Sequence, residues 1–180
     1  RYQPDYHRAM MNRHKVPREL GVAVNAATVR EFDPDVVVIA SGAEAVVPDV
    51  PGLAEARAAG FAFTIDEALS RDAPAKLGQR VVVYGAGEGA ELAVELMRAG
   101  RDVRLLDAAP QYVPTNYIGS RVYAIMGLMA VSGVGVEGKL ALTRVANGTI
   151  EVRDANGEAQ SIEADSLGFC CGRKPDRKST

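Results

Sequence analysis

The clearest hydrophobic pattern in the sequence lies between residues 80 and 107. A continuous apolar, β-branched run at Val81–Tyr84 predicts a strand that is covered on both faces of a parallel sheet. A glycine-rich turn follows, then good helix formers over Ala90–Ala99 that end at Gly100, and then a second strand at Val103–Leu106. The order strand, turn, helix and strand within this length predicts a βαβ unit.

The residues before this unit predict a helix and two further strands. Pro4–Leu20 carries apolar residues at loosely helical spacing, and Gly21–Val29 alternates as expected for a half-buried strand. Val36–Ala40 is again continuously apolar, which predicts another strand covered on both faces. Thr64, with Glu67 three residues later, fits the capping box at the start of a short helix.

The residues after the unit change from helical to alternating spacing. A helix is predicted over 117–131, and a short parallel strand follows at Val134–Val136. Two Asn-Gly pairs, at 147–148 and 156–157, separate alternating segments and predict a three-stranded antiparallel meander. Leu167–Cys171 predicts a last buried strand. The whole pattern predicts an α/β fold, a Rossmann-like three-layer nucleotide-binding domain with a β-meander.

Composition narrows the classes of function. The 180 residues carry a formal net charge of −2 and a sequence pI near 5.8, whereas a nucleic-acid-binding domain is expected to have a pI above about 9. No apolar run reaches the roughly 18 residues that cross a bilayer, and the charged start of the chain lacks the apolar core of a signal peptide. We therefore expect a cytoplasmic protein without a nucleic-acid or membrane partner.

The two cysteines are the neighbours Cys170 and Cys171. They cannot join distant parts of the chain, and their spacing does not fit a zinc site. A redox pair is one interpretation. Because adjacent residues of a strand face opposite ways, we expect instead two small buried side chains without chemistry. The sequence predicts no metal site and no catalytic residue.

The candidate chemistry lies in the turn between the first strand and the helix of the βαβ unit. Gly85 permits the tight turn, Gly87 lets the backbone approach a pyrophosphate, and the small Ala90 lets the helix pack closely on the strand. Unpaired N–H groups and the positive end of the helix dipole favour bound phosphate. The candidate cofactor-binding residues of the turn are Gly85, Ala86, Gly87, Glu88, Gly89 and Ala90.

An acidic residue, Asp107, closes the next strand 22 residues after Gly85. A carboxylate at this place accepts hydrogen bonds from a ribose 2′-hydroxyl and repels a 2′-phosphate, which favours NAD(H) over NADP(H). Two other carboxylates near the turn, Glu88 and Glu91, would weaken phosphate binding unless they point away from it. A turn that is merely structural is therefore a second interpretation.

Three segments, which together span most of the chain, carry a family resemblance. They are Asp33–Leu53 (DPDVVVIASGAEAVVPDVPGL), Val81–Ala93 (VVVYGAGEGAELA) and Ala164–Asp176 (ADSLGFCCGRKPD). The chain resembles the C-terminal dinucleotide-binding region of Old Yellow Enzyme-related NADH:flavin oxidoreductases, which are of the pyridine nucleotide-disulfide oxidoreductase type. This class includes 2,4-dienoyl-CoA reductase, 2-enoate reductase and trimethylamine dehydrogenase-like enzymes.

The resemblance implies that the chain is one region of a longer flavoprotein. Residues 1–72 would hold part of a second, FAD- or ADP-binding type of domain and the crossover, residues 73–164 the NAD(P)-binding domain, and residues 165–180 the strand that returns to the partial domain. FAD or FMN and an iron-sulfur cluster would belong to the intact protein, whose remaining flavin domains are the implied partners. This chain alone is expected to be inactive.

The resemblance also extends the candidate site. The glycine turn is one residue shorter than the family pattern, so either Gly89 or Ala90 stands at its third glycine. The crossover and the end of the last strand are implied neighbours of the dinucleotide. The candidates added there are Ser41, Gly42, Gly172 and Arg173.

The implied function is the binding of NADH and the orientation of its nicotinamide for hydride transfer to a flavin held elsewhere in the intact protein. The alternative is a non-catalytic ADP-binding or structural domain, as in amine-dehydrogenase-like flavoproteins. A packing domain without a ligand would follow if Glu88 or Glu91 pointed into the phosphate site.

Overall fold

The computed structural model describes residues 2–70, 76–110 and 119–175. Contacts divide the chain into two units, one up to Gly42 and one over Ala43–Pro175. The expected start of a domain at residue 73 lies outside the described residues, and the ranges 1–72, 73–164 and 165–180 stay a prediction.

The first unit contains two helices, α1 (Tyr2–Arg13) and α2 (Ala26–Phe32). The helix expected near the N-terminus is present and ends before Pro17, which could not continue it. The strand expected at Gly21–Val29 is wrong. The side-chain oxygen of Asn25 accepts hydrogen bonds from the N–H groups of Ala27 and Thr28 at 2.8 and 3.1 Å, and this N-cap starts α2 instead.

The strand expected at Val36–Ala40 is also absent from the described chain. The backbone there is extended without ladder hydrogen bonds, and the side chains are exposed, at 84% for Val38 and 74% for Ile39. A strand needs a neighbour to pair with its backbone groups, and no described strand pairs with this run. The prediction of a strand at Val36–Ala40 is therefore wrong for the described structure.

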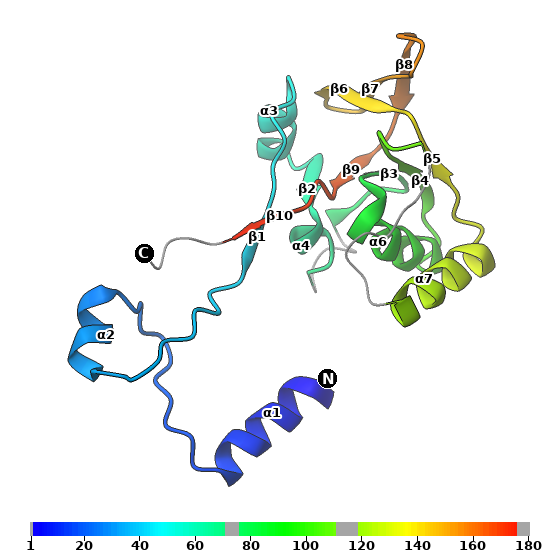
Figure 1. The fold of residues 1–180 in the computed structure, drawn as a ribbon. Helices are drawn as coiled ribbons and strands as arrows, with labels where there is room; N and C mark the ends of the chain where they lie inside the picture. Colours follow the sequence, from blue (N-terminus) through cyan, green and yellow to red (C-terminus); the bar gives the residue numbers. More distant parts are fainter. Residues whose placement is uncertain (1, 71–75, 111–118, 176–180) are drawn as a thin grey trace. The chain divides into compact units, whose positions relative to one another are not determined.

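The second unit is built on a five-stranded parallel sheet (Figure 1). Its strands, in spatial order, are β2 (Ala62–Thr64), β9 (Ser166–Phe169), β3 (Arg80–Tyr84), β4 (Asp102–Leu106) and β5 (Val136–Glu137). The expected strand at Leu167–Cys171 forms as β9 and lies in the interior of the sheet, between β2 and β3. The carboxyl ends of β3, β4 and β9 therefore meet at one edge.

Helices cover one face of this sheet. They are α4 (Ile65–Ala68), α6 (Ala86–Arg98) and α7 (Gly119–Ser132). Val81 and Val83 of β3 point into a core with these helices, while Val82 between them points to the opposite face. This alternation is the reason that the run at Val81–Tyr84 is apolar throughout, and α6 completes the predicted βαβ unit.

The opposite face is covered by α3 (Leu53–Ala58) and by an antiparallel meander. The meander consists of β6 (Ala141–Ala146), β7 (Thr149–Arg153) and β8 (Ala159–Glu163), and it lies at the top of the unit in Figure 1. Helices, sheet and meander form the three layers predicted from the sequence, and the α/β, Rossmann-like fold class is confirmed.

Two local features complete the second unit. The short strands β1 (Ala43–Ala45) and β10 (Arg173–Pro175) pair antiparallel. Thr64 and Glu67 form the predicted capping box, in which the Glu67 carboxylate accepts from the N–H of Thr64 at 2.7 Å and the Thr64 hydroxyl accepts from the N–H of Glu67 at 3.3 Å.

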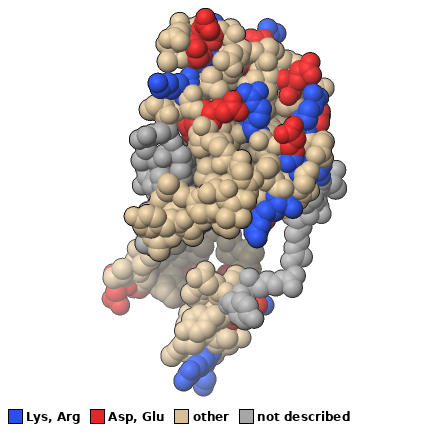
Figure 2. Space-filling view, turned by 90° about the vertical axis from the view of Figure 1, so that its right-hand side faces the viewer, with Lys and Arg blue, Asp and Glu red and all other residues tan. Residues whose placement is uncertain are grey.

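The surface of the molecule mixes charges of both signs. On the face drawn in Figure 2, acidic and basic side chains lie side by side over much of the surface, next to an area without charged residues.

α7 packs on α6 with Ile125 and Met129, and its Tyr123 and Val131 remain exposed. None of the described helices combines the length and the apolar character that a membrane span requires.

Candidate functional site

The glycine turn begins at Gly85, between β3 and α6. The backbone of Gly85 has φ 99° and ψ 99°, and its N–H donates to the carbonyl of Leu106 at 2.8 Å. A Cβ atom at this position would lie 2.3 Å from the carbonyl oxygen of Cys170. Because β9 approaches this closely and φ is positive, only glycine fits here without strain.

The next two glycines have different surroundings. A Cβ on Gly87 would meet nothing within 4 Å, so the first turn of α6 is open at this point. A Cβ on Gly89 would lie 2.9 Å from Cγ1 of Val83 and 3.3 Å from Sγ of Cys170. Gly89 rather than Ala90 is therefore the glycine at which the helix packs closely on the sheet, while Ala90 is fully buried in the core.

Asp107 follows β4 and lies beside the start of α6. Its Oδ2 accepts a hydrogen bond from the N–H of Ala86 at 2.6 Å, and its Oδ1 accepts from the N–H of Ala109 at 2.7 Å. The carboxylate thus fixes the entry of the helix against the loop after β4. Each carboxylate oxygen retains a further lone pair for another donor.

The start of α6 has two N–H groups left for a ligand. The first four N–H groups of a helix lack partners within it, and here they belong to Gly85, Ala86, Gly87 and Glu88. Leu106 and Asp107 accept from the first two, which leaves those of Gly87 and Glu88. Two donors at the positive end of a helix, above a glycine with open space around it, fit a phosphate group.

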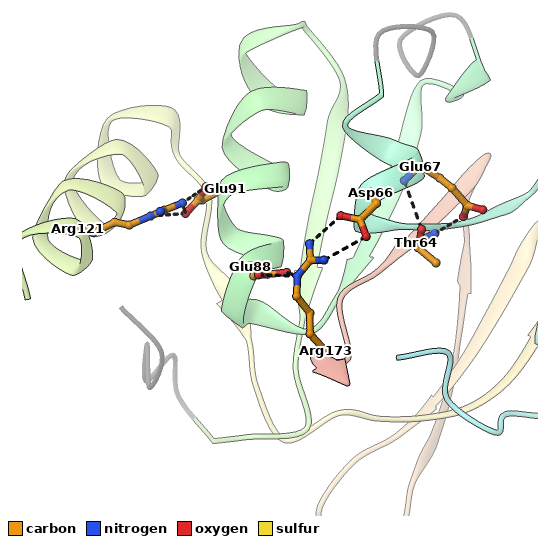
Figure 3. Close-up of polar contacts among 7 residues, drawn as sticks. All are labelled: Thr64, Asp66, Glu67, Glu88, Glu91, Arg121 and Arg173. Atoms are coloured by element: carbon orange, nitrogen blue, oxygen red, sulfur yellow. Dashed lines mark hydrogen bonds and ion pairs between the residues drawn. The ribbon is translucent and has the colours of Figure 1, made fainter. Parts of the chain in front are cut away.

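Glu88 is held by Arg173, a residue of β10 (Figure 3). Nε of Arg173 donates to both carboxylate oxygens of Glu88 at 3.0 Å, and its Nη1 and Nη2 donate to Asp66 of α4 at 3.2 and 2.7 Å. These hydrogen bonds, to Asp66 first and then to Glu88, raise the pKa of the Arg173 guanidinium above its ordinary value. We call these three residues the Arg173 bridge.

Glu91, one turn further along α6, pairs with Arg121 of α7 (Figure 3). Nη2 of Arg121 donates to Oε1 and Oε2 of Glu91 at 2.6 and 2.9 Å. Both carboxylates that the sequence places near the turn are therefore engaged by arginines. Asp66 and Arg121 escape sequence analysis, because ion pairs between distant segments leave no local pattern.

The two cysteines contact opposite sides of the sheet, as expected for neighbours at a strand end, but both are half-buried rather than buried. Cys170 packs against the helix-side core and Cys171 against the meander-side core. Burial raises the pKa of the Cys170 thiol to about 12 and also raises that of Cys171. Both thiols are therefore protonated at neutral pH, which does not suit a nucleophile or a redox-active thiolate.

The remaining candidates divide between the two units. Gly172 has φ 90°, and its carbonyl accepts from the N–H of Val46 at 2.9 Å, beside the β1–β10 pair. Ser41 and Gly42 belong to the first unit, directly before β1, and Gly42 has φ 84°. Their part in binding a cofactor stays a prediction. The second unit brings together the turn, Asp107 and Arg173.

A separate pocket of about 440 Å³ opens beside β2 and α4. Its lining includes Asp66 of the Arg173 bridge but none of the residues of the glycine turn. The residues that line it are Arg57, Ala62, Phe63, Asp66, Glu67, Ser70 and Lys76.

Comparison with known proteins identifies the family. The family model described as pyridine nucleotide-disulphide oxidoreductase matches residues 7–180. The chain belongs to this family. The pyridine nucleotide-disulphide oxidoreductase assignment agrees with the glycine turn at the carboxyl end of β3 and with Asp107 beside it.

A relative and two solved structures show how much of this family's architecture the chain contains. The nitric oxide reductase FlRd-NAD(+) reductase of Pectobacterium atrosepticum is 37% identical over 87 residues, which cover 46% of this chain and 21% of that protein. A 2-naphthoyl-CoA reductase complex is similar with a TM-score of 0.78 at 21% identity, over 96% of this chain and 25% of that one.

Histamine dehydrogenase from Rhizobium sp. 4-9 is similar with a TM-score of 0.71 at 20% identity, over 97% of this chain and 28% of that one. At these identities the two structures establish the fold alone. The matched segment spans 21% of the curated relative, and the chain covers 25% and 28% of the two solved chains. The chain is a domain of the pyridine nucleotide-disulphide oxidoreductase type with a Rossmann-like fold.

Proposed function

We propose that this chain is the NADH-binding region of an NADH:flavin oxidoreductase, and that it orients the nicotinamide toward a flavin held elsewhere in the intact protein. One observation carries the proposal. The turn at Gly85–Ala90 offers two N–H donors, Asp107 lies beside it, and arginines hold both nearby glutamates. A dianionic pyrophosphate can therefore approach the helix start without meeting a loose carboxylate.

Each residue of the site has a role in binding. The N–H groups of Gly87 and Glu88 donate to phosphate oxygens, and Gly85 and Gly89 keep the helix close to the sheet. Asp107 accepts from the ribose 2′-hydroxyl with the lone pairs that Ala86 and Ala109 leave free. When bound, NADH supplies the hydride equivalents, while the residues of this chain bind and orient it.

The charge of Asp107 also selects the cofactor. A 2′-phosphate would stand against this carboxylate, so NADPH is disfavoured relative to NADH. The relative in Pectobacterium atrosepticum has NAD(+) in its name, nitric oxide reductase FlRd-NAD(+) reductase, which supports this preference.

The intact protein would carry the rest of the machinery. We infer a parent of the Old Yellow Enzyme-related class, with FAD or FMN and an iron-sulfur cluster in its other domains. Val36–Ala40 then supplies a strand to the flavin domain, and its exposed apolar side chains support this assignment. Ser41 and Gly42, which follow this run, are the predicted contacts at the domain crossover.

A second candidate function is a non-catalytic ADP-binding or structural domain. The similarity to histamine dehydrogenase favours it, since that enzyme is an amine dehydrogenase. The two candidate functions differ in the ligand that the site is expected to bind most tightly. A hydride donor site recognises the whole dinucleotide, whereas a structural site gains nothing from the nicotinamide half.

Calorimetric titration with NADH, NADPH and ADP tests the proposal on wild type, Asp107→Asn and the control Asp102→Asn. Asp102 starts the same strand and is exposed. We expect wild type to bind NADH more tightly than ADP or NADPH, and Asp107→Asn to narrow the NADH preference over NADPH about tenfold. Equal affinity for NADH and ADP would favour the structural domain, and no binding of either would refute both functions.

A further inference from the structure

Glu88 occupies a position from which its side chain can compete with a bound phosphate. With Gly85 as the N-cap of α6, Glu88 is the third residue of the helix. Its carboxylate lies within one helical turn of the N–H groups of Gly87 and Glu88, so its negative charge competes there with a bound anion. Those groups are the donors that a pyrophosphate needs.

The Arg173 bridge holds this carboxylate elsewhere. Nε of Arg173 contacts both oxygens of Glu88, and the other side of the guanidinium contacts Asp66 in a paired geometry. α4 carries Asp66 and is itself fixed by the capping box of Thr64 and Glu67 (Figure 3). Two carboxylates and one guanidinium leave a single net negative charge beside the turn.

We propose that Arg173 is a positioning residue, which keeps the Glu88 carboxylate away from the first-turn N–H groups so that they remain open to the pyrophosphate of a dinucleotide. This inference rests on the proposed function. Arg173 acts through Glu88, because its Nε contacts both oxygens of that carboxylate while Nη1 and Nη2 contact Asp66. One N–H remains on Nη1 and one on Nη2, so direct contact with phosphate is the alternative that the test separates. Without Arg173, the Glu88 carboxylate is no longer held away from these donors, and its charge repels the incoming anion.

The test compares ADP, which carries the pyrophosphate, with adenosine, which does not. Affinities are measured by calorimetry for wild type, Arg173→Gln, Glu88→Gln and the double variant. We expect Arg173→Gln to weaken ADP binding about tenfold and to leave adenosine binding unchanged. The double variant should bind ADP within about twofold of wild type, because it lacks the competing carboxylate.

Arg98→Gln is the matched control, because it breaks an ion pair of α6 with Glu95 that lies at the far end of the helix from the glycine turn. We expect no change in its ADP affinity. An equal loss of ADP and adenosine binding in Arg173→Gln would indicate a merely structural role. A loss of ADP binding that Glu88→Gln does not restore would indicate direct contact between Arg173 and phosphate. Either result overturns the inference.

Failure of the proposed function gives a different result. If wild type binds neither ADP nor NADH, the site is not a dinucleotide site, and the inference falls with it. If wild type binds ADP and Arg173→Gln binds it equally well, the proposed function stands and only the role of Arg173 is refuted.

Discussion

Gly85, Gly87 and Gly89 are glycines for three separate physical reasons. Gly85 has positive φ and lies against the carbonyl of Cys170, and Gly89 lies against Val83. Gly87 is in helical conformation with open space around it, so neither sterics nor strain requires glycine there. Under the proposed function, glycine at this position gives a ligand access to the backbone, and this role can be tested separately from stability.

Gly87→Ala is expected to stabilise the protein and to weaken its binding of ADP. Alanine in a helix is favoured over glycine by about 0.5–1 kcal/mol, and the new methyl group meets no protein atom. It would, however, stand where the phosphate approaches. Urea unfolding and calorimetric titration with ADP measure the two effects.

Gly127→Ala in α7 is the control for this prediction, since a Cβ there also meets nothing within 4 Å. It should give a similar gain in stability without any loss of ADP binding. A Gly87→Ala variant that binds ADP as wild type does would remove phosphate access as the reason for this glycine.

At the scale of single residues, the sequence predicts the features that depend only on residues nearby in the chain. The turn and its distance to Asp107 follow from local order, since strand, turn, helix and strand place the acid beside the helix start. The directions of Glu88 and Glu91 could not be predicted, because they depend on Arg173 and Arg121, which are distant in the sequence.

The elements of the chain differ in how well their own residues determine them. The meander forms as predicted because two Asn-Gly turns fix its register locally, with Gly148 at φ 87° and Gly157 at φ 89°. Gly21–Val29 shows the reverse, since alternation suggested a strand and the side chain of Asn25 instead caps a helix. A strand also depends on its partners, which Val36–Ala40 lacks among the described strands.

The capping box of α4 predicts a pH dependence of stability. Burial by itself would raise the pKa of Glu67, but the hydrogen bonds from Thr64 and the nearby Arg57 guanidinium outweigh it and lower the pKa below its ordinary value of 4.5. A carboxyl with a lowered pKa in the folded state stabilises the protein above the unfolded-state pKa, and this stabilisation is lost as the pH falls through the folded-state pKa.

Glu67→Gln should therefore reduce the change of the free energy of unfolding with pH between about pH 5 and pH 3. The reason is that glutamine keeps the capping hydrogen bond but does not titrate. Urea unfolding at a series of pH values measures this slope. An unchanged slope in Glu67→Gln would show that the carboxylate does not contribute.

On the scale of the whole molecule, the two units differ in their cores. The second unit buries two apolar clusters, one on each face of its sheet. Among the described residues up to Gly42, none is buried. The first unit therefore has little hydrophobic stabilisation of its own in this chain.

Limited proteolysis should thus cleave the chain first within residues up to 42, and the sheet strands and α6 should remain intact. Mass spectrometry of the early fragments identifies the sites. If the chain is part of the proposed flavoprotein, the same sites near Val36–Ala40 should be protected in that protein by its flavin domain. Early cleavage within β3, β4 or β9 would contradict the division into a weakly and a well-packed unit.

The interior position of β9 governs the order in which the sheet can be completed. β9 pairs with β2 on one side and with β3 on the other, where Ser166 lies opposite Val81. In the sequence, however, β9 comes after both of these strands, so it is synthesised last of the three. On the ribosome, β3, β4 and β5 can pair as they emerge, but β2 has no place in the sheet until the ribosome has made β9. Such late, long-range closure is slow and exposes strand edges to other chains, so a nascent chain of this protein would gain from a chaperone until β9 is released.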